Sequence, residues 1–210
     1  MDVFATVLFA DVIRSRHDAT AATEWLRTLR TDLTATYSAA ELLAPFEFTQ
    51  GDELQGLLTS SADPVRAVLR AALHPARVAM RWVVVAGEID PGHGPATQRS
   101  GPAFIAARER LAVASARRER LAIVSGDPAT DELLEGLAPL LGELLADLTD
   151  RQRSIAWLVL VEGFRRSEVA ERLRVSRATV SVAADRANLR SIGDLARVVR
   201  TLLARVTMSS

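Results

Sequence analysis

The order of strand-like and helix-like segments in the first 125 residues constrains the fold of this chain most strongly. Short apolar, β-branched runs are typical of buried strands, and apolar residues three or four apart are typical of helices. These patterns predict strands at 3–10, 46–50, 54–59 and 78–85, and helices at 19–37 and 63–73. The order β-α-β-β-α-β favours an α+β fold with a ferredoxin-like sheet. A further helix is predicted at 101–116 and an edge strand at 121–124.

The remainder of the chain is predicted to be all-α. The segment 126–147 contains several glycines and prolines within a helical pattern, which predicts a broken helical connector. The segment 148–210 has the pattern of a helix-turn-helix domain, described below. The expected organisation is therefore a sheet domain at 1–125, a connector at 126–147 and a helical domain at 148–210.

Composition excludes several classes of chemistry. All 26 basic residues are arginine, so mechanisms that need a lysine, such as a Schiff base, a P-loop or a kinase, are excluded. The absence of cysteine excludes disulfides, a thiol nucleophile and a cysteine zinc site. The three histidines lack zinc-ligand spacing. The N-terminal sequence has no basic leader and no apolar run spans a bilayer, so we expect a cytoplasmic protein that does not enter the membrane.

Charge is divided unevenly between the two parts of the chain. Residues 151–210 hold 12 arginines and 5 acids, a net charge of +7, whereas residues 1–150 hold 14 arginines and 21 acids, a net charge of −7. A basic module beside an acidic one is expected when only one of them meets phosphate. Arginines that simply solvate helix faces would give the same count.

The C-terminal segment has the pattern of a helix-turn-helix. Thr149 and Gln152 have the spacing of a capping box, which predicts a helix that ends at Gly163. Apolar residues then fall at 169, 173, 175, 180 and 183, which suits two helices that cross steeply. Ser176 is predicted to cap the second of these helices. A small helical bundle used for dimerisation is the alternative.

The second helix of this pair is the predicted DNA-reading element. Its first turn is expected to present Arg177, Ala178 and Ser181 to the major groove of double-stranded DNA. Nearby arginines are expected to contact backbone phosphates; they are Arg165, Arg166, Arg172, Arg174 and Arg186.

The segments 148–153, 162–163 and 168–173 resemble region four of sigma factors and the LuxR-type response regulators. The resemblance implies a DNA-binding helix-turn-helix. The chain departs from that pattern at Arg174, where the family usually has glycine, and a left-handed backbone there would cost an arginine about 1 kcal/mol. The apolar stripe at 192–206 predicts a terminal helix that packs on the bundle or on a second subunit.

Two aspartates are predicted to meet at one edge of the sheet. In the expected topology the first strand lies between the third and fourth and runs antiparallel to both. Asp11 at the end of that strand and Asp52 in the predicted hairpin turn then converge, with Glu53 nearby. Close carboxylates either bind a divalent cation or share a proton. Gly-Asp is also favoured in hairpin turns for backbone reasons alone, so a purely structural role stays open.

The same residues resemble class III nucleotidyl cyclases. The matching segments are 9–12, 51–53, 81–88, 101–103 and 106–108. The resemblance implies that Asp11 and Asp52 hold Mg²⁺ and that Arg108 binds a phosphorylated ligand such as a nucleotide. The chain departs from the family at the purine-reading lysine, which is Phe48, and at the transition-state asparagine, which is Phe104 or Ile105. Cyclase activity is therefore not expected.

A closer resemblance, over residues 3–125, is to the SatD family. It is carried by the segments Gly-Asp-Glu-Leu-Gln-Gly at 51–56, Gly-Glu-Ile at 87–89 and Ser-Gly-Pro-Ala at 100–103. Some members of that family carry a C-terminal helix-turn-helix.

Three classes of function fit these observations. The favoured one is a DNA-binding transcriptional regulator whose degenerate cyclase-like domain senses a ligand or dimerises. A metal-dependent nucleotide enzyme with an accessory helical module is the alternative, and a protein used only for assembly is the third. A homodimer is expected, because helix-turn-helix dimers read paired half-sites.

Overall fold

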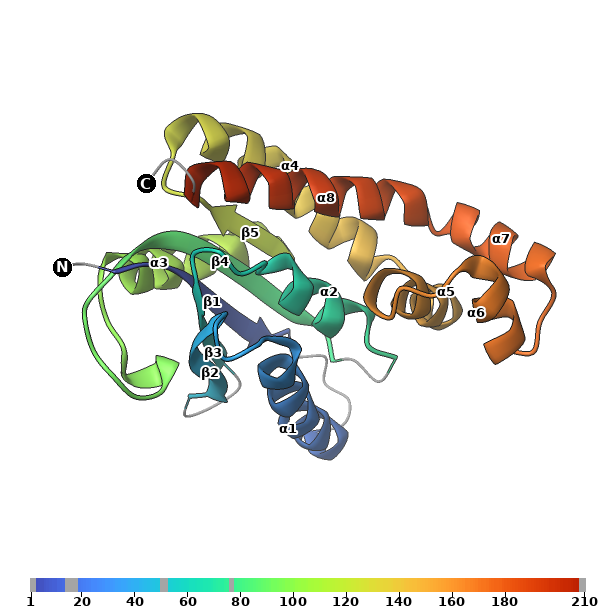
Figure 1. Cartoon of the computed structure of the whole chain (residues 1–210), viewed down its shortest axis with the longest axis horizontal. Coiled ribbons are helices and arrows are strands. Elements are labelled where there is room, and N and C mark those ends of the chain that lie inside the picture. The colour runs from blue at the N-terminus through green and yellow to red at the C-terminus, as the bar shows by residue number, and fades with distance from the viewer. Residues whose placement is uncertain (1–2, 14–18, 50–52, 76–77, 208–210) are drawn as a thin grey trace.

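The computed structural model describes residues 3–13, 19–49, 53–75 and 78–207, and in this part of the chain it has a mixed five-stranded sheet and eight α-helices. The first part contains β1 (Val3–Val12), α1 (Ala19–Thr36), β2 (Leu42–Phe48), β3 (Glu53–Thr59), α2 (Val65–Leu73), β4 (Met80–Ile89), η1 (Ala96–Gln98), α3 (Pro102–Arg117) and β5 (Leu121–Val124). The second part contains α4 (Pro128–Ala146), α5 (Asp150–Ala156), η2 (Trp157–Val161), α6 (Arg166–Arg172), α7 (Arg177–Arg186) and α8 (Leu189–Thr207). The predicted organisation is a part with strands and helices followed by a part with helices only, and the structure confirms it (Figure 1).

The strand order of the sheet is β2-β3-β1-β4-β5. β1 pairs antiparallel with β3 on one side and with β4 on the other, as predicted. β5 forms the predicted edge strand and lies parallel to β4. The predicted second strand was too short, because β2 begins at Leu42 rather than at residue 46. The hairpin turn predicted at Gly51 and Asp52 lies outside the described residues.

The two faces of the sheet are covered by different helices. Along β1, Leu8 and Ala10 join a large apolar cluster that includes α1, α2 and α4, whereas Val7 and Phe9 join a smaller cluster under α3. This alternation follows from the two-residue period of a strand. The larger cluster continues without interruption through α5, α6, α7 and α8. The sheet and the helical part are therefore held together by one continuous apolar core.

The segment predicted as a helical connector at 126–147 is helical, but the predicted break in it is wrong, because α4 is one continuous helix of 19 residues. Asp127 caps its first turn by accepting a hydrogen bond from the Thr130 amide at 2.8 Å. Pro139 inside the helix removes one hydrogen bond, a change that costs about 3 kcal/mol. Buried leucines such as Leu134 and Leu141 each contribute about 2 kcal/mol against that cost. Tertiary packing thus overrides the local signal of the proline.

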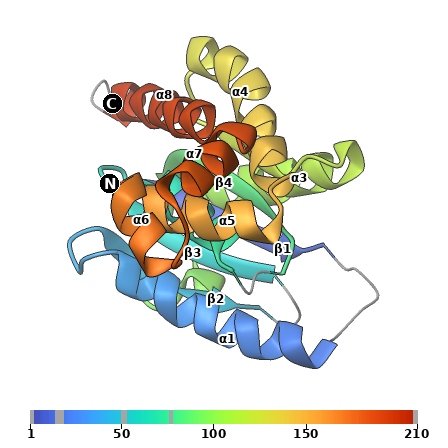
Figure 2. The same cartoon turned by 90° about the vertical axis from the view of Figure 1, so that its right-hand side faces the viewer.

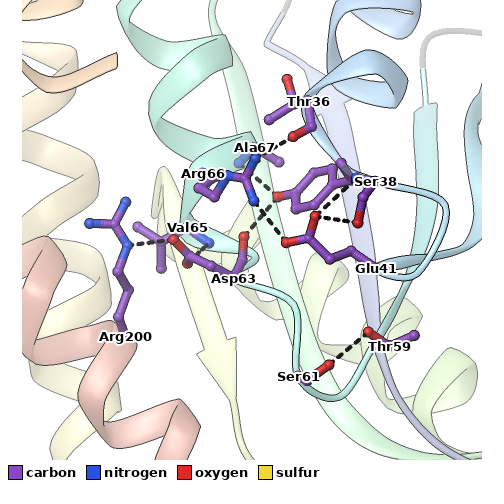
Figure 3. A network of polar contacts seen from close by, with 11 residues as sticks. Thr36, Ser38, Glu41, Thr59, Ser61, Asp63, Val65, Arg66, Ala67 and Arg200 are labelled. Atoms are coloured by element: carbon purple, nitrogen blue, oxygen red, sulfur yellow. Dashed lines mark hydrogen bonds and ion pairs between the residues drawn. The ribbon is translucent and has the colours of Figure 1, made fainter. Parts of the chain in front are cut away.

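α8 returns from the far end of the helical part and packs against α4 and α2 (Figures 1 and 2). The helix predicted at 192–206 therefore packs on this same chain, and it begins earlier, at Leu189. Arg200 of α8 donates from Nε to the Asp63 carboxylate at 2.6 Å, just before α2 (Figure 3). This ion pair ties the C-terminal helix to the sheet domain.

Asp63 belongs to a polar network at the start of α2. The Tyr37 hydroxyl donates to the Asp63 carbonyl at 2.8 Å and accepts from the Ala67 amide at 3.1 Å. Burial raises the pKa of Tyr37, so the hydroxyl keeps its proton. Arg66 donates to Glu41 at 2.8 Å and also to the Thr36 carbonyl (Figure 3). The network fixes the chain between α1, β2 and α2.

His74 lies where α1, α2 and the helical part meet. Its Nδ1 accepts a hydrogen bond from Trp25 Nε1 at 3.2 Å, and its ring meets the Trp157 ring edge-on at 5.3 Å between centroids. Burial lowers the pKa of His74, which favours the neutral imidazole that this acceptor geometry requires. Across the described ranges, no helix is both long enough and apolar enough to cross a membrane.

Candidate nucleic-acid interface

The helical part begins with the predicted capping box. Thr149 Oγ1 accepts from the Gln152 amide at 3.4 Å, and Gln152 Oε1 accepts in return from the Thr149 amide at 2.9 Å. The helix that follows changes to a π-helical stretch at η2. Gly163, with φ of 74°, ends it as predicted. Residues close in the sequence therefore determine where the first helix of the helical part begins and ends.

The segment between α6 and α7 forms a tight turn. Arg174 adopts a left-handed backbone with φ of 53°, so the turn keeps the conformation that favours glycine although an arginine was expected to disfavour it. The Val175 amide donates to the Ala170 carbonyl at 3.0 Å, which closes the end of α6. Ser176 then caps α7, because its Oγ accepts from the Thr179 amide at 3.1 Å, and that prediction is also confirmed.

The inner faces of α6 and α7 are buried against each other and the neighbouring helices. Val169, Ala170 and Val180 are buried as predicted. Leu173 was expected in this core but is 36% exposed, because it lies at the C-cap of α6, beyond the last turn that faces α7. Ala184, rather than Ala183, is the fully buried alanine of α7. The packing therefore follows the predicted pattern with a shift of one residue at the end.

The outer face of α7 lies on the surface of the molecule. Ser176, Arg177, Ala178 and Arg186 are exposed, and Ser181 is half-buried. Figure 1 shows α7 at the opposite end of the molecule from α3, and in Figure 2 α7 lies at the front with no other described helix or strand over it. The DNA contacts predicted for the first turn of α7 require this face to be accessible to a partner.

The predicted phosphate-contacting arginines divide into two groups. Arg165 and Arg174 are exposed at the two ends of α6. Arg166 is also exposed but pairs with Asp185 of α7 at 3.2 Å, so it ties the two helices together. The Arg172 guanidinium lies 3.8 Å from the centroid of the Phe164 ring, a cation–π contact that sets its direction. Sequence alone does not reveal these internal partners.

A groove of about 600 Å³ runs beside α7, and no local sequence pattern predicts it. It is lined by residues from the start of α5 and from α7, among them Arg151, Gln152, Ala178, Val182 and Arg186. Val182 is 50% exposed there. The capping box showed where α5 begins, but the contact between α5 and α7 depends on tertiary packing. Arg151 thereby joins the basic residues around α7.

Asp11 lies at the predicted edge of the sheet but has an internal cationic partner. In the sheet register it is opposite Glu53 of β3 and Arg81 of β4. Arg81 Nη1 lies 3.1 and 2.9 Å from the two Asp11 oxygens, and Arg81 Nε donates to the Glu119 carbonyl at 3.1 Å. Glu53 accepts a hydrogen bond from Gln55 at 2.7 Å. One edge of the sheet thus carries a row of charged residues across three strands.

Asp11 is the only one of the two predicted Mg²⁺ ligands that lies among the described residues of this row. Across the described ranges, no group of three His, Cys, Asp or Glu side chains could hold a metal ion. Asp52, the other predicted Mg²⁺ ligand, lies outside the described residues. Arg108 is exposed on α3, whereas the Asp11 carboxylate binds Arg81 of β4. Phe104 is buried and meets Phe9 edge-on at 6.0 Å, so it packs α3 on the sheet.

A scan of protein-family models finds none that matches this chain, and a search of curated proteins finds no similar sequence. The resemblances to the SatD family, to nucleotidyl cyclases and to sigma and LuxR-type helix-turn-helix proteins therefore remain predictions from the residues quoted above.

Proposed function

We propose that this protein is a DNA-binding transcriptional regulator in which α6, the turn at Arg174 and α7 act as a helix-turn-helix. The observation that carries the proposal is the division of α7 into two faces. Val180 and Ala184 are buried against the other helices, whereas Arg177 and Ala178 are exposed in the first turn. A recognition helix needs this arrangement, since its first residues reach base edges.

The charge around α7 supports double-stranded DNA as the partner. Exposed arginines surround the helix, and they include Arg151, Arg165, Arg174 and Arg186. Guanidinium groups bind phosphate well, because their planar donors match its oxygens. Arg166 contributes less in this proposal, since Asp185 already neutralises it.

The sheet domain is proposed to be a ferredoxin-like sensing or dimerisation domain. The order β2-β3-β1-β4, with α1 and α2 contributing to the same apolar cluster, supports that assignment. A metal-dependent nucleotide enzyme has less support, because Arg81 engages both oxygens of Asp11 where a cation would need them. Mg²⁺ binding is therefore not part of the proposed mechanism.

The test is binding of the full chain to a duplex selected from a random library by the wild-type protein. Arg177→Ala is expected to weaken binding about tenfold, the discrimination of one good base contact. Arg30→Ala, an exposed arginine of α1, is the matched control and should leave the affinity unchanged. Fluorescence anisotropy over a range of salt concentrations measures both variants, and wild-type affinity should fall steeply with salt. Equal binding by the two variants, or no selected duplex at low salt, would overturn the proposal.

A further inference from the structure

α4 and α8 form a pair of helices on the outside of the molecule. They lie side by side and run in opposite directions, with α4 also packed on β5 (Figures 1 and 2). Each helix has 19 residues, a length of about 28 Å at 1.5 Å per residue. Large apolar side chains of both helices are exposed on the outer side of this pair.

The rotation of α4 is fixed by contacts on two sides. Leu134 and Leu141 are buried, and Glu135 accepts from Arg117 of α3 at 3.2 Å. At 100° per residue, a row of leucines then falls on the side of α4 away from α3. The row consists of Leu133, Leu137, Leu140 and Leu144. Leu133 is 54% exposed and Leu140 is 52% exposed.

The rotation of α8 brings its own apolar edge toward the same seam. Arg200 is bound to Asp63 on the α2 side of the helix (Figure 3). Val198 lies on the side of α8 opposite Arg200 and is 40% exposed. The neighbouring Leu195 and Leu202 turn inward and pack against the core. The α4–α8 face is defined as this leucine row together with Val198. Its apolar centre is exposed at Leu133, Leu140 and Val198.

The two helices that border this face carry opposite charges. On α4 the exposed acids Glu132 and Glu143 lie outside the ion pair of Glu135 with Arg117. On α8 the exposed arginines include Arg190 and Arg197, which share the single carboxylate of Asp194. A surface that is acidic on one helix and basic on the other complements itself under a two-fold rotation. DNA does not suit this face, because the acids of α4 repel phosphate.

We propose that the α4–α8 face is the surface through which two copies of this chain pair. A two-fold axis through the face sets α4 of each copy beside α8 of the other, so that exposed leucines meet and acids face arginines twice. The apolar centre supplies the association free energy, and the charged borders fix the relative orientation.

Sedimentation of the full chain tests the apolar centre. The wild type is expected to be a dimer, and Leu133→Glu with Leu140→Glu is expected to shift the mass to one chain. Ile105→Glu on α3, a site 62% exposed and outside the face, is the matched control and should remain a dimer. Circular dichroism verifies that each variant is folded. A monomeric wild type, or a double variant that stays dimeric, overturns the proposal.

A charge-swap experiment tests the orientation. One variant reverses acids of α4 (Glu132→Arg, Glu143→Arg), and the other reverses arginines of α8 (Arg190→Glu, Arg197→Glu). Each alone has like charges on both borders and is expected to be monomeric, but an equimolar mixture should form a heterodimer. A mixture that stays monomeric overturns the proposed pairing of α4 with α8. Neither measurement involves DNA, so failure here is distinct from failure of the proposed function.

Discussion

The two regions that the sequence singled out as candidate sites, the α7 face and the Asp11 edge of the sheet, differ in how their charges are used. At the sheet edge, Asp11 is 29% exposed and Arg81 is 10% exposed, and they bind each other. At the helical end, Arg177 and Arg186 are exposed on a helix whose other face is buried. A charge with an internal partner contributes to the fold, whereas an exposed cluster of one sign favours an external partner.

The largest effect is expected from Asp11→Asn, which tests whether the sheet edge is structural. The substitution leaves the mostly buried Arg81 without its counter-ion, so we expect a loss of about 2 kcal/mol in the free energy of unfolding. Urea denaturation measures it, with exposed Glu88→Gln on the adjacent strand β4 as the control. A metal site would behave oppositely: the variant would be as stable as wild type without metal, and Mg²⁺ would stabilise only the wild type.

A smaller effect of opposite sign is expected from Arg174→Gly, which tests how the helical face is built. Glycine tolerates the left-handed backbone at φ of 53°, but it also increases the entropy of the unfolded chain, so the net gain should be about 0.5 kcal/mol. Arg118→Gly at the end of α3, where φ is 60°, should give a similar gain. Only Arg174→Gly should also weaken DNA binding; if both or neither variant did so, Arg174 would not be a phosphate contact.

The smallest effect concerns His74, which lies where the sheet part meets the helical part. Its folded-state pKa lies below the ordinary value of 6.5, so the unfolded chain binds its proton first as the pH falls. Stability should therefore decrease as the pH is lowered through 6.5 and stop decreasing below the folded pKa. Asp32 opposes this shift and Arg70 adds to it.

Thermal unfolding between pH 7 and pH 5 checks the His74 prediction. His74→Gln should flatten the pH dependence, whereas His93→Gln, in an exposed loop, should leave it unchanged. An unchanged slope in His74→Gln would assign the effect to another group.

The fold was predictable wherever local pattern and connectivity agree. The position of β1 between β3 and β4 follows from the order of elements, and the caps at Thr149 and Ser176 follow from residue type and spacing. The continuous α4 was not predictable, because only the burial of its leucines against β5 outweighs Pro139. Likewise, Leu173 fits the apolar pattern but lies beyond the helix contact that would bury it.

The candidate sites were predictable as residue types but not as pairings. The sequence placed Asp11 at a strand end, yet its ion pair with Arg81, 70 residues later, depends on the register of β1 and β4. The pairing of Arg166 with Asp185 depends in the same way on how α6 crosses α7. The role predicted for Asp52 stays a prediction, since that residue lies outside the described ranges.

The ion pair between Arg200 and Asp63 has a consequence for dissecting this chain. The last helix, α8, completes the apolar core of the sheet part. A fragment that ends before Thr149 would therefore expose part of that core to solvent. Conversely, in an isolated C-terminal fragment α8 would lack its packing contacts with α4 and α2. Domain swaps that join this helical end to another protein should therefore carry α4 with it.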